Sequence, residues 1–176
     1  MKLVECVPNF SEGRRPEIVD AIIAAALTEN GVILLDKEMD ADHNRCVVTL
    51  VGAPEPVSRA AFNAVRKAAE LIDMRTHKGE HPRMGATDVV PFVPISGLSL
   101  TDCATLARQL GQRIGEELAI PVYFYEAAAT RPDRENLADV RRGEYEGIRD
   151  VMQSDPNRRP DAGPALMNLK SGATAV

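Results

Sequence analysis

The chain of 176 residues contains no tryptophan, and aromatic residues of all kinds make up only 4% of it. Its apolar fraction of 44% and charged fraction of 27% are still those of a globular protein that folds in water. The hydrophobic core must therefore be built from Ile, Leu, Val and Ala. The length predicts one ordinary domain with a core of its own.

Cysteine is also scarce. Cys6, Cys46 and Cys103 are odd in number and widely spaced, and each lies in an apolar run. This pattern excludes a disulfide framework and predicts reduced, buried thiols. No signal peptide precedes the first strand-like segment, and no apolar run approaches the length of a membrane span. We therefore expect a cytoplasmic protein with no membrane partner.

The chain has no excess of positive charge. Lys and Arg number 21 against 26 Asp and Glu, which gives a formal net charge of −5. This balance argues against nucleic acid as a partner, because nucleic-acid binding needs a basic face. Enough Lys and Arg remain for a local cationic site that binds an acidic small molecule.

The order of predicted elements indicates an α+β fold. Apolar runs and alternation predict strands at residues 3–7, 32–36, 45–51, 89–94 and 121–125, and helices at 16–30, 56–73 and 100–119, with helical pieces in 136–150. The first six elements give a ferredoxin-like βαββαβ core, extended to a mixed sheet with helices mainly on one face. Pro91 and Pro94 place the fourth strand at an edge or a bulge. We expect one unit over residues 1–153, followed by an extended, mobile tail over residues 154–176.

The stretch from Asp73 to Asp88 holds two of the three histidines of the chain, and its Gly and Pro residues predict a loop. His77 and His81 are four residues apart, which is the spacing of two zinc ligands on a helix. Gly79 between them and Pro82 after them disfavour a continuous helix, and no cysteine lies nearby. The sequence therefore predicts no metal site here.

His81 has two interpretations. It can be a general acid/base in a concave site, oriented by one of the carboxylates of Glu80 or Asp88. It can equally be a loop histidine that caps a helix end or meets solvent. Composition alone leaves both open.

Three other polar stretches also have two interpretations each. Residues 9–16 join a strand to a helix start, where backbone amides bind an anion or form an ordinary polar turn. Residues 36–45 are acidic enough for calcium but lack the EF-hand spacing, and most such runs are solvated loops. Residues 131–134 and 139–142 form either a cationic patch or a salt-bridged surface helix.

Three strings of the sequence resemble the formiminotransferase family. The opening, residues 4–13 (VECVPNFSEG), is similar to the start of that family. Residues 71–74 (LIDM) and 77–86 (HKGEHPRMGA) closely resemble its active-site loop, and residues 136–147 (NLADVRRGEYEG) resemble a third block. The strings occur in the family's order and span nearly the whole chain, so the chain is identified as a member.

The resemblance implies a transferase of histidine catabolism and one-carbon metabolism. It moves a formimino group from N-formimino-L-glutamate to N5 of tetrahydrofolate, the co-substrate, and requires no metal. His81 matches the family's catalytic histidine. Glu38 matches an acidic position where many relatives carry Asp, and we count it with the catalytic residues. The folate-contacting stretch of the family corresponds here to Gly163, Pro164, Ala165, Leu166, Met167, Asn168, Leu169, Lys170, Ser171 and Gly172.

Relatives continue into a second subdomain, and the folate cleft lies between the two halves. The chain therefore corresponds to the N-terminal subdomain, and the resemblance implies the C-terminal subdomain, or a separate chain supplying it, as a partner. We also expect a homodimer, because an inter-domain face exposes apolar surface. The alternative function is a non-catalytic folate-binding or interaction module that retains only this subdomain.

Overall fold

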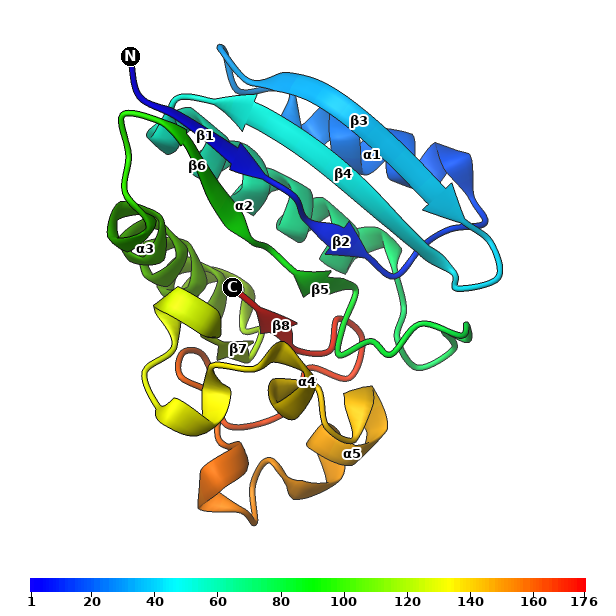
Figure 1. The fold of residues 1–176 in the computed structure, drawn as a ribbon. Helices are drawn as coiled ribbons and strands as arrows, with labels where there is room; N and C mark the ends of the chain where they lie inside the picture. The colour runs from blue at the N-terminus through cyan, green and yellow to red at the C-terminus, as the bar shows by residue number, and fades with distance from the viewer.

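The structure, a computed structural model, describes residues 1–176 and forms one mixed sheet with helices packed against it (Figure 1). The elements in chain order are β1 (Leu3–Cys6), β2 (Asn9–Phe10), α1 (Pro16–Ala26), β3 (Ile33–Asp40), β4 (Arg45–Gly52), α2 (Pro54–Leu71), β5 (Thr87–Val89), β6 (Phe92–Ser96), α3 (Leu100–Leu118), β7 (Val122–Tyr123), the 3₁₀ turns η1 (Glu126–Ala128) and η2 (Pro132–Arg134), α4 (Leu137–Val140), α5 (Glu144–Val151), η3 (Pro156–Arg158) and β8 (Thr174–Ala175). No helix is long and apolar enough to cross a membrane.

The sheet confirms the predicted α+β class. β4 pairs antiparallel with β3 on one side and with β1 and β2 on the other, and β1 and β2 pair antiparallel with β6 and β5. This is the strand order of a ferredoxin-like βαββαβ core. β8 extends the core as a parallel neighbour of β5, and β7 pairs parallel with β8.

The predicted fourth strand is broken in two. Pro91 lies between β5 and β6 and has no N–H to donate to a ladder. Its carbonyl oxygen instead accepts from Val7 N at 3.1 Å, at the matching break between β1 and β2. The two prolines therefore mark a bulge, and β6 forms an edge of the sheet, as the sequence predicts.

The helices α1 and α2 lie behind β1, β3 and β4 in Figure 1, and the face turned toward the viewer carries no helix over these strands. The alternation of buried and partly buried side chains along β4 explains this arrangement. Cys46, Val48 and Leu50 are buried on the helix side, whereas Val47 and Thr49 on the other side are only partly buried. We call the second side the uncovered face of the sheet. Fully burying one such apolar side chain contributes about 1.5–3 kcal/mol.

The three cysteines are free and buried, as predicted. Burial raises the pKa of the Cys46 thiol to about 12 and also raises the pKa values of Cys6 and Cys103. The thiolate forms are therefore disfavoured, and the three side chains act as small apolar core residues.

The segment between β7 and β8 is held by a buried ion pair. Arg134 Nη1 lies 2.6 Å from Asp161 Oδ2, and the Phe124 amide donates to the same carboxylate at 2.9 Å. Removing one partner of such a pair costs about 3–5 kcal/mol, since the other charge stays buried. Arg131 pairs with Asp133, and Arg142 with Asp139. Residues 131–134 and 139–142 are therefore salt-bridged rather than a free cationic patch, although Arg134 is buried in a 3₁₀ turn and does not lie on a surface helix.

The prediction of a mobile tail is wrong. Residues 173–176 are buried, and β8 lies between β5 and β7 within the sheet. Val90 N donates to Ala175 O at 2.9 Å, and Thr174 N donates to Pro121 O at 3.0 Å. Small side chains carry little apolar signal in a sequence, yet they allow the backbone to pair with two neighbouring strands. The proposed boundary after residue 153 stays a prediction.

The loop that precedes β5, residues 73–86, is held by the turn between β3 and β4. Asn44 in that turn has a positive φ of 50°, accepts from Gly13 N and donates from Nδ2 to Lys78 O, both at 2.9 Å. His77 lies against the same turn, with Nε2 at 3.1 Å from Asn44 O. Arg83 Nε donates to the other ring nitrogen, Nδ1, at 3.3 Å. Nε2 therefore carries the proton, and the ring is neutral.

We predict that Ala119→Gly stabilises the protein. Ala119 ends α3 with a left-handed φ of 52°, and its side chain is exposed. Glycine removes the steric cost of this conformation, so the free energy of unfolding should rise by about 1 kcal/mol, and the melting temperature by roughly 2–4 °C. The matched control is Ala24→Gly in α1, also exposed, where loss of helix propensity should lower stability by about 1 kcal/mol. Equal effects of the two variants in thermal melts would contradict this.

We also predict a pH dependence of stability that originates at His77. Burial, the largest effect on this ring, lowers its pKa in the folded state. The unfolded state then binds more protons as the pH falls below about 6.5, so the stabilising effect of the neutral ring is lost in that range. Urea unfolding of the wild type should show a smaller free energy of unfolding at acidic than at neutral pH. His77→Gln keeps a donor for Asn44 O and should flatten this slope; an unchanged slope would rule His77 out as its source.

Candidate functional site

His81 lies in the loop before β5 and is held by a carboxylate. Its ring is 7% exposed, and Nε2 lies 3.3 Å from Asp88 Oδ2. Asp88 is fully buried in β5. Because a carboxylate oxygen accepts, Nε2 of the neutral ring carries the proton in this pair. Of the two carboxylates that the sequence offers, the structure selects Asp88 over Glu80.

Two further donors fix Asp88. The Met84 amide donates to Oδ1 at 2.8 Å, and Arg141 Nη2 donates to Oδ2. Arg141 directly follows α4, so it comes from a distant part of the chain. A carboxylate that accepts from a backbone amide and a guanidinium is held in one orientation, and this orientation is passed to His81.

The other ring nitrogen of His81 is free. Nδ1 has no hydrogen-bond partner in the chain, and it is not among the buried side-chain atoms that lack one. It therefore retains contact with solvent. With Nε2 protonated toward Asp88, Nδ1 is the nitrogen that can accept a proton from outside.

The expectation that His81 lies in a concave site stays a prediction. His81 lines none of the hollows described below, and its ring is almost fully buried. Two hollows instead border the preceding part of the loop, with volumes of about 490 and 400 Å³, and both are lined by His77 and Lys78. Most arginines around them are already paired, such as Arg75 with Asp73 and Arg149 with Asp150.

The polar stretch at residues 9–16 forms a closed turn. Glu12 is buried, and its Oε1 accepts from Arg14 N at 2.9 Å and from Arg15 N at 3.0 Å. The Glu12 side chain therefore occupies the backbone amides that could otherwise have bound an anion. The ordinary polar turn is therefore the correct interpretation.

In the acidic stretch at residues 36–45, a carboxylate also accepts hydrogen bonds from groups of the same stretch. Asp40 accepts from the amides of Asp42 and His43 and from the His43 ring. No group of three or more His, Cys, Asp or Glu side chains is arranged to hold a metal ion.

Glu38 lies on β3, and no hydrogen bond or ion pair joins it to His81. Glu38 lines a separate hollow of about 380 Å³ on the uncovered face of the sheet, together with Met39, Asp40, Arg45 and Val47. The structure therefore does not bring the two predicted catalytic residues together directly.

The stretch from Gly163 to Gly172 begins beside α3 and ends on the histidine loop. Its first part is open, and Leu166 is 58% exposed. Its last part is pinned, because Met74 N donates to Lys170 O at 2.8 Å and Ala86 N donates to Ser171 O at 2.7 Å. The structure thus joins the predicted folate stretch to the loop that carries His81.

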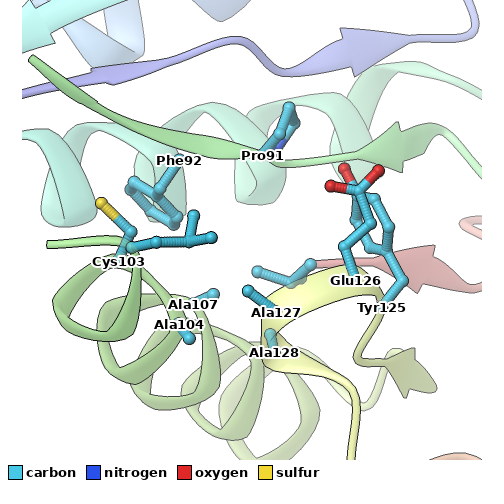
Figure 2. Close-up of a pocket in the computed structure, with 11 residues that line it drawn as sticks. Pro91, Phe92, Cys103, Ala104, Ala107, Tyr125, Glu126, Ala127 and Ala128 are labelled. Atoms are coloured by element: carbon cyan, nitrogen blue, oxygen red, sulfur yellow. The ribbon is translucent and has the colours of Figure 1, made fainter. Parts of the chain in front are cut away.

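An apolar pocket of about 60 Å³ lies elsewhere, between Pro91, α3 and η1 (Figure 2). Phe92, Cys103 and Ala104 form one side of it, and Tyr125, Glu126 and Ala127 lie on the other. Burial raises the pKa of the Tyr125 hydroxyl to about 12, so this phenol stays neutral at physiological pH. The pocket offers little polar chemistry apart from the Glu126 carboxylate.

Three contributors were missed from the sequence. Asn44 holds the loop, Arg141 holds Asp88, and Arg45 lines the hollow of Glu38. For Asn44 a signal was present, since an Asn between two predicted strands favours a turn with positive φ. For Arg141, the sequence offered only its place in the charged stretch 139–142 and in a string that resembles the family, and neither indicates Asp88 as its partner.

The comparisons with known proteins agree with this geometry. The family model for the formiminotransferase domain, N-terminal subdomain, matches residues 3–176. A glutamate formimidoyltransferase of Streptococcus pyogenes is 48% identical over 175 residues, which is 99% of this chain and 58% of that protein. One of Thermoplasma acidophilum is 48% identical over 178 residues, 100% of this chain and 58% of that protein.

A longer relative is the formimidoyltransferase-cyclodeaminase of Rattus norvegicus, which is 49% identical over 175 residues. The alignment covers 99% of this chain and 32% of that protein. The chain therefore spans little more than half the length of the shorter relatives and about a third of the longer one. Over the part that it spans, the chain belongs to the formiminotransferase family, as an N-terminal subdomain.

Proposed function

We propose that this chain supplies the catalytic-histidine half of a transferase that moves a formimino group from N-formimino-L-glutamate to N5 of tetrahydrofolate. The names of its relatives support the transfer of a formimidoyl group, with glutamate as the molecule that carries this group. The observation that carries the proposal is the pairing of His81 with the buried Asp88, which leaves Nδ1 free to exchange a proton.

The proposed chemistry needs one group that first accepts and then donates a proton. The N5 amine attacks the amidine carbon, a C–N bond forms, and the N5 proton passes to His81. The bond between that carbon and the glutamate nitrogen then breaks, and His81 returns the proton to the departing nitrogen. No net proton is gained or lost, so one imidazole serves both steps.

Asp88 supports this cycle in the proposal. A carboxylate that accepts from Nε2 holds the tautomer and stabilises the imidazolium formed in the first step. Arg141 and the Met84 amide donate to that carboxylate and keep it in place. The protein contributes tautomer, orientation and charge, and tetrahydrofolate enters as co-substrate. No metal has a role in the proposed steps.

The folate site is part of the proposal. In this proposal the stretch from Gly163 to Gly172 forms one wall of it, because its end is hydrogen-bonded to the loop of His81 and its first part is exposed at Leu166. The remaining wall would come from a C-terminal subdomain, which the longer relatives have room to contain. We place the reaction in the cytoplasm, in line with the three buried free thiols.

We further propose that this chain works in an assembly. The uncovered face of the sheet exposes Ile33, Leu35, Val93 and Ile95, and exposed apolar side chains on one face favour a partner. A C-terminal subdomain and a second copy of this chain, in a homodimer, are the partners that we expect there.

A second function is favoured by one observation. His81 does not line a hollow, and a half-open site excludes water poorly. The chain alone would then be a non-catalytic folate-binding or interaction module.

We predict that His81→Ala lowers turnover by about 10²–10⁴-fold in the complete two-subdomain protein, the usual contribution of a positioned proton shuttle. Transfer to tetrahydrofolate is the measurement, with circular dichroism as the folding control. Asp88→Asn should also lower turnover, because its amide can present a donor to Nε2 and reverse the tautomer. A folded His81→Ala variant with unchanged turnover would refute the assigned role.

A titration with a stable folate analogue separates the two functions. If the folate site needs both halves, this chain alone should bind the analogue weakly, and adding the separately produced second half should restore tight binding and activity. If the chain alone binds tightly but stays inactive even after the second half is added, the binding-module function is correct. Isothermal calorimetry and a transfer assay on the same samples provide both readouts.

A further inference from the structure

His81 and Arg141 share a single carboxylate oxygen. His81 Nε2 lies 3.3 Å from Asp88 Oδ2, and Arg141 Nη2 donates to the same atom. The other oxygen, Oδ1, accepts from the Met84 amide at 2.8 Å. Asp88 is fully buried and carries one negative charge, so a protonated His81 and the guanidinium would have to share that charge. The position of Arg141 therefore affects the protonation of the ring as well as its orientation.

The hydrogen bonds of Arg141 differ from those of an ordinary structural ion pair. A guanidinium frequently meets a carboxylate with two parallel hydrogen bonds. Here only Nη2 donates to Asp88, while the Met84 amide occupies Oδ1. Nε of Arg141 is buried and has no partner. A buried donor without an acceptor is unfavourable, so packing and hydrogen bonding alone do not account for an arginine at this position.

The other charged and titratable groups that flank His81 or act on the same ion pair are screened, neutral or already paired. They are Glu80, Tyr125, and Arg83 with its partners Glu144 and Glu146. Glu80 is exposed, so solvent screens its charge. Burial raises the pKa of the Tyr125 hydroxyl to about 12, which keeps this group neutral beside Arg141 and Asp88. The charges that govern the protonation of His81 are therefore those of Asp88 and Arg141.

The charge of this cluster at rest favours a neutral ring. Asp88 and Arg141 together carry no net charge, so a proton on His81 leaves one net positive charge in a largely buried cluster. A nearby like charge disfavours the protonated form of the ring, whereas a carboxylate without its guanidinium would favour that form. A guanidinium does not lose its proton, so this opposition persists at every physiological pH. Without Arg141, His81 would stay protonated over a wider pH range and could not act as a base there.

We propose that Arg141 is a positioning residue that acts through Asp88, keeps His81 neutral at rest and promotes the return of its proton. This inference deepens the proposed function and rests on it. In the first step the N5 proton passes to Nδ1, and the ring becomes an imidazolium that shares one carboxylate with a guanidinium. In the second step the same proton leaves Nδ1 for the departing glutamate nitrogen. Repulsion between the two cations favours this second transfer, and Asp88 stays ionised throughout.

The first test titrates the three histidine rings of this chain by NMR. Arg141→Gln keeps a donor for Asp88 but removes the positive charge, so the midpoint of the His81 titration should rise by about one pH unit. Arg141→Lys keeps the charge and should leave the midpoint near that of the wild type. The matched control is Arg142→Gln, because Arg142 is the next residue, is mostly exposed and pairs with Asp139. Identical His81 titration curves in the wild type and Arg141→Gln would refute the proposal.

Thermal melts accompany each variant, because Arg141→Gln leaves the buried Asp88 carboxylate without a charged partner. A second comparison avoids this problem by removing the carboxylate as well. Adding Arg141→Gln to Asp88→Asn should raise the His81 midpoint by about one pH unit relative to Asp88→Asn alone, since the guanidinium still opposes the imidazolium in the single variant. Equal midpoints in these two proteins would contradict the proposal even if Arg141→Gln alone does not fold.

The last test measures transfer in the complete two-subdomain protein as a function of pH. Arg141→Gln should lower turnover about tenfold on the acidic side of the profile and little on the alkaline side, where His81 is neutral with or without the guanidinium. Arg141→Lys should restore the wild-type profile. A merely structural role would lower turnover by the same factor at every pH, and that result would overturn the proposal. The NMR midpoints do not depend on turnover, so a failed His81→Ala assay would refute the proposed function and leave them measurable.

Discussion

The histidine loop depends on the burial of one carboxylate. Asp88 has no exposed surface, so its charge must be compensated within the chain. The compensation comes from the Met84 amide, the His81 ring and Arg141, which belong to two segments far apart in the sequence. Each of these groups is thereby fixed relative to the others. The loop before β5 and the α4–α5 region are therefore joined at Asp88, the same carboxylate that holds the His81 ring.

The region around Asp88 is closed by backbone packing. A side chain at Gly85 would meet the carbonyl oxygen of Ala173, and one at Gly79 would meet that of His43. Glycine at these two positions lets the loop lie directly against β8 and the β3–β4 turn. The rigidity of the site therefore comes from absent side chains as much as from the polar contacts.

A sequence pattern predicts a feature of this structure well when the residues that determine the feature lie close together in the chain, and poorly when they lie far apart. The βαββαβ core was predictable because the periodicity of Ile22, Val65 and Leu110 is local and strong. β8 was not, because Thr174 and Ala175 are too small to signal burial and pair with strands far away in the sequence. At the site, Gly79 and Pro82 were sufficient to predict a loop. The choice of Asp88 over Glu80 was not predictable, since it depends on a guanidinium from Arg141. Glu38 was placed by resemblance alone, and the structure adds its free neighbour Arg45.

The position of β8 has a consequence for how the chain folds. β5 and β7 have no direct ladder between them, and each pairs with β8 instead. During synthesis the ferredoxin-like core can therefore form early, while the facing edges of β5 and β7 stay open until residues 174–175 have left the ribosome. Parallel pairing over such a sequence separation is slow, because the long loop must close before any contact rewards it. In the interval an unpaired edge can accept a strand of another molecule. Nascent chains should thus depend on chaperones most strongly just before β8 leaves the ribosome.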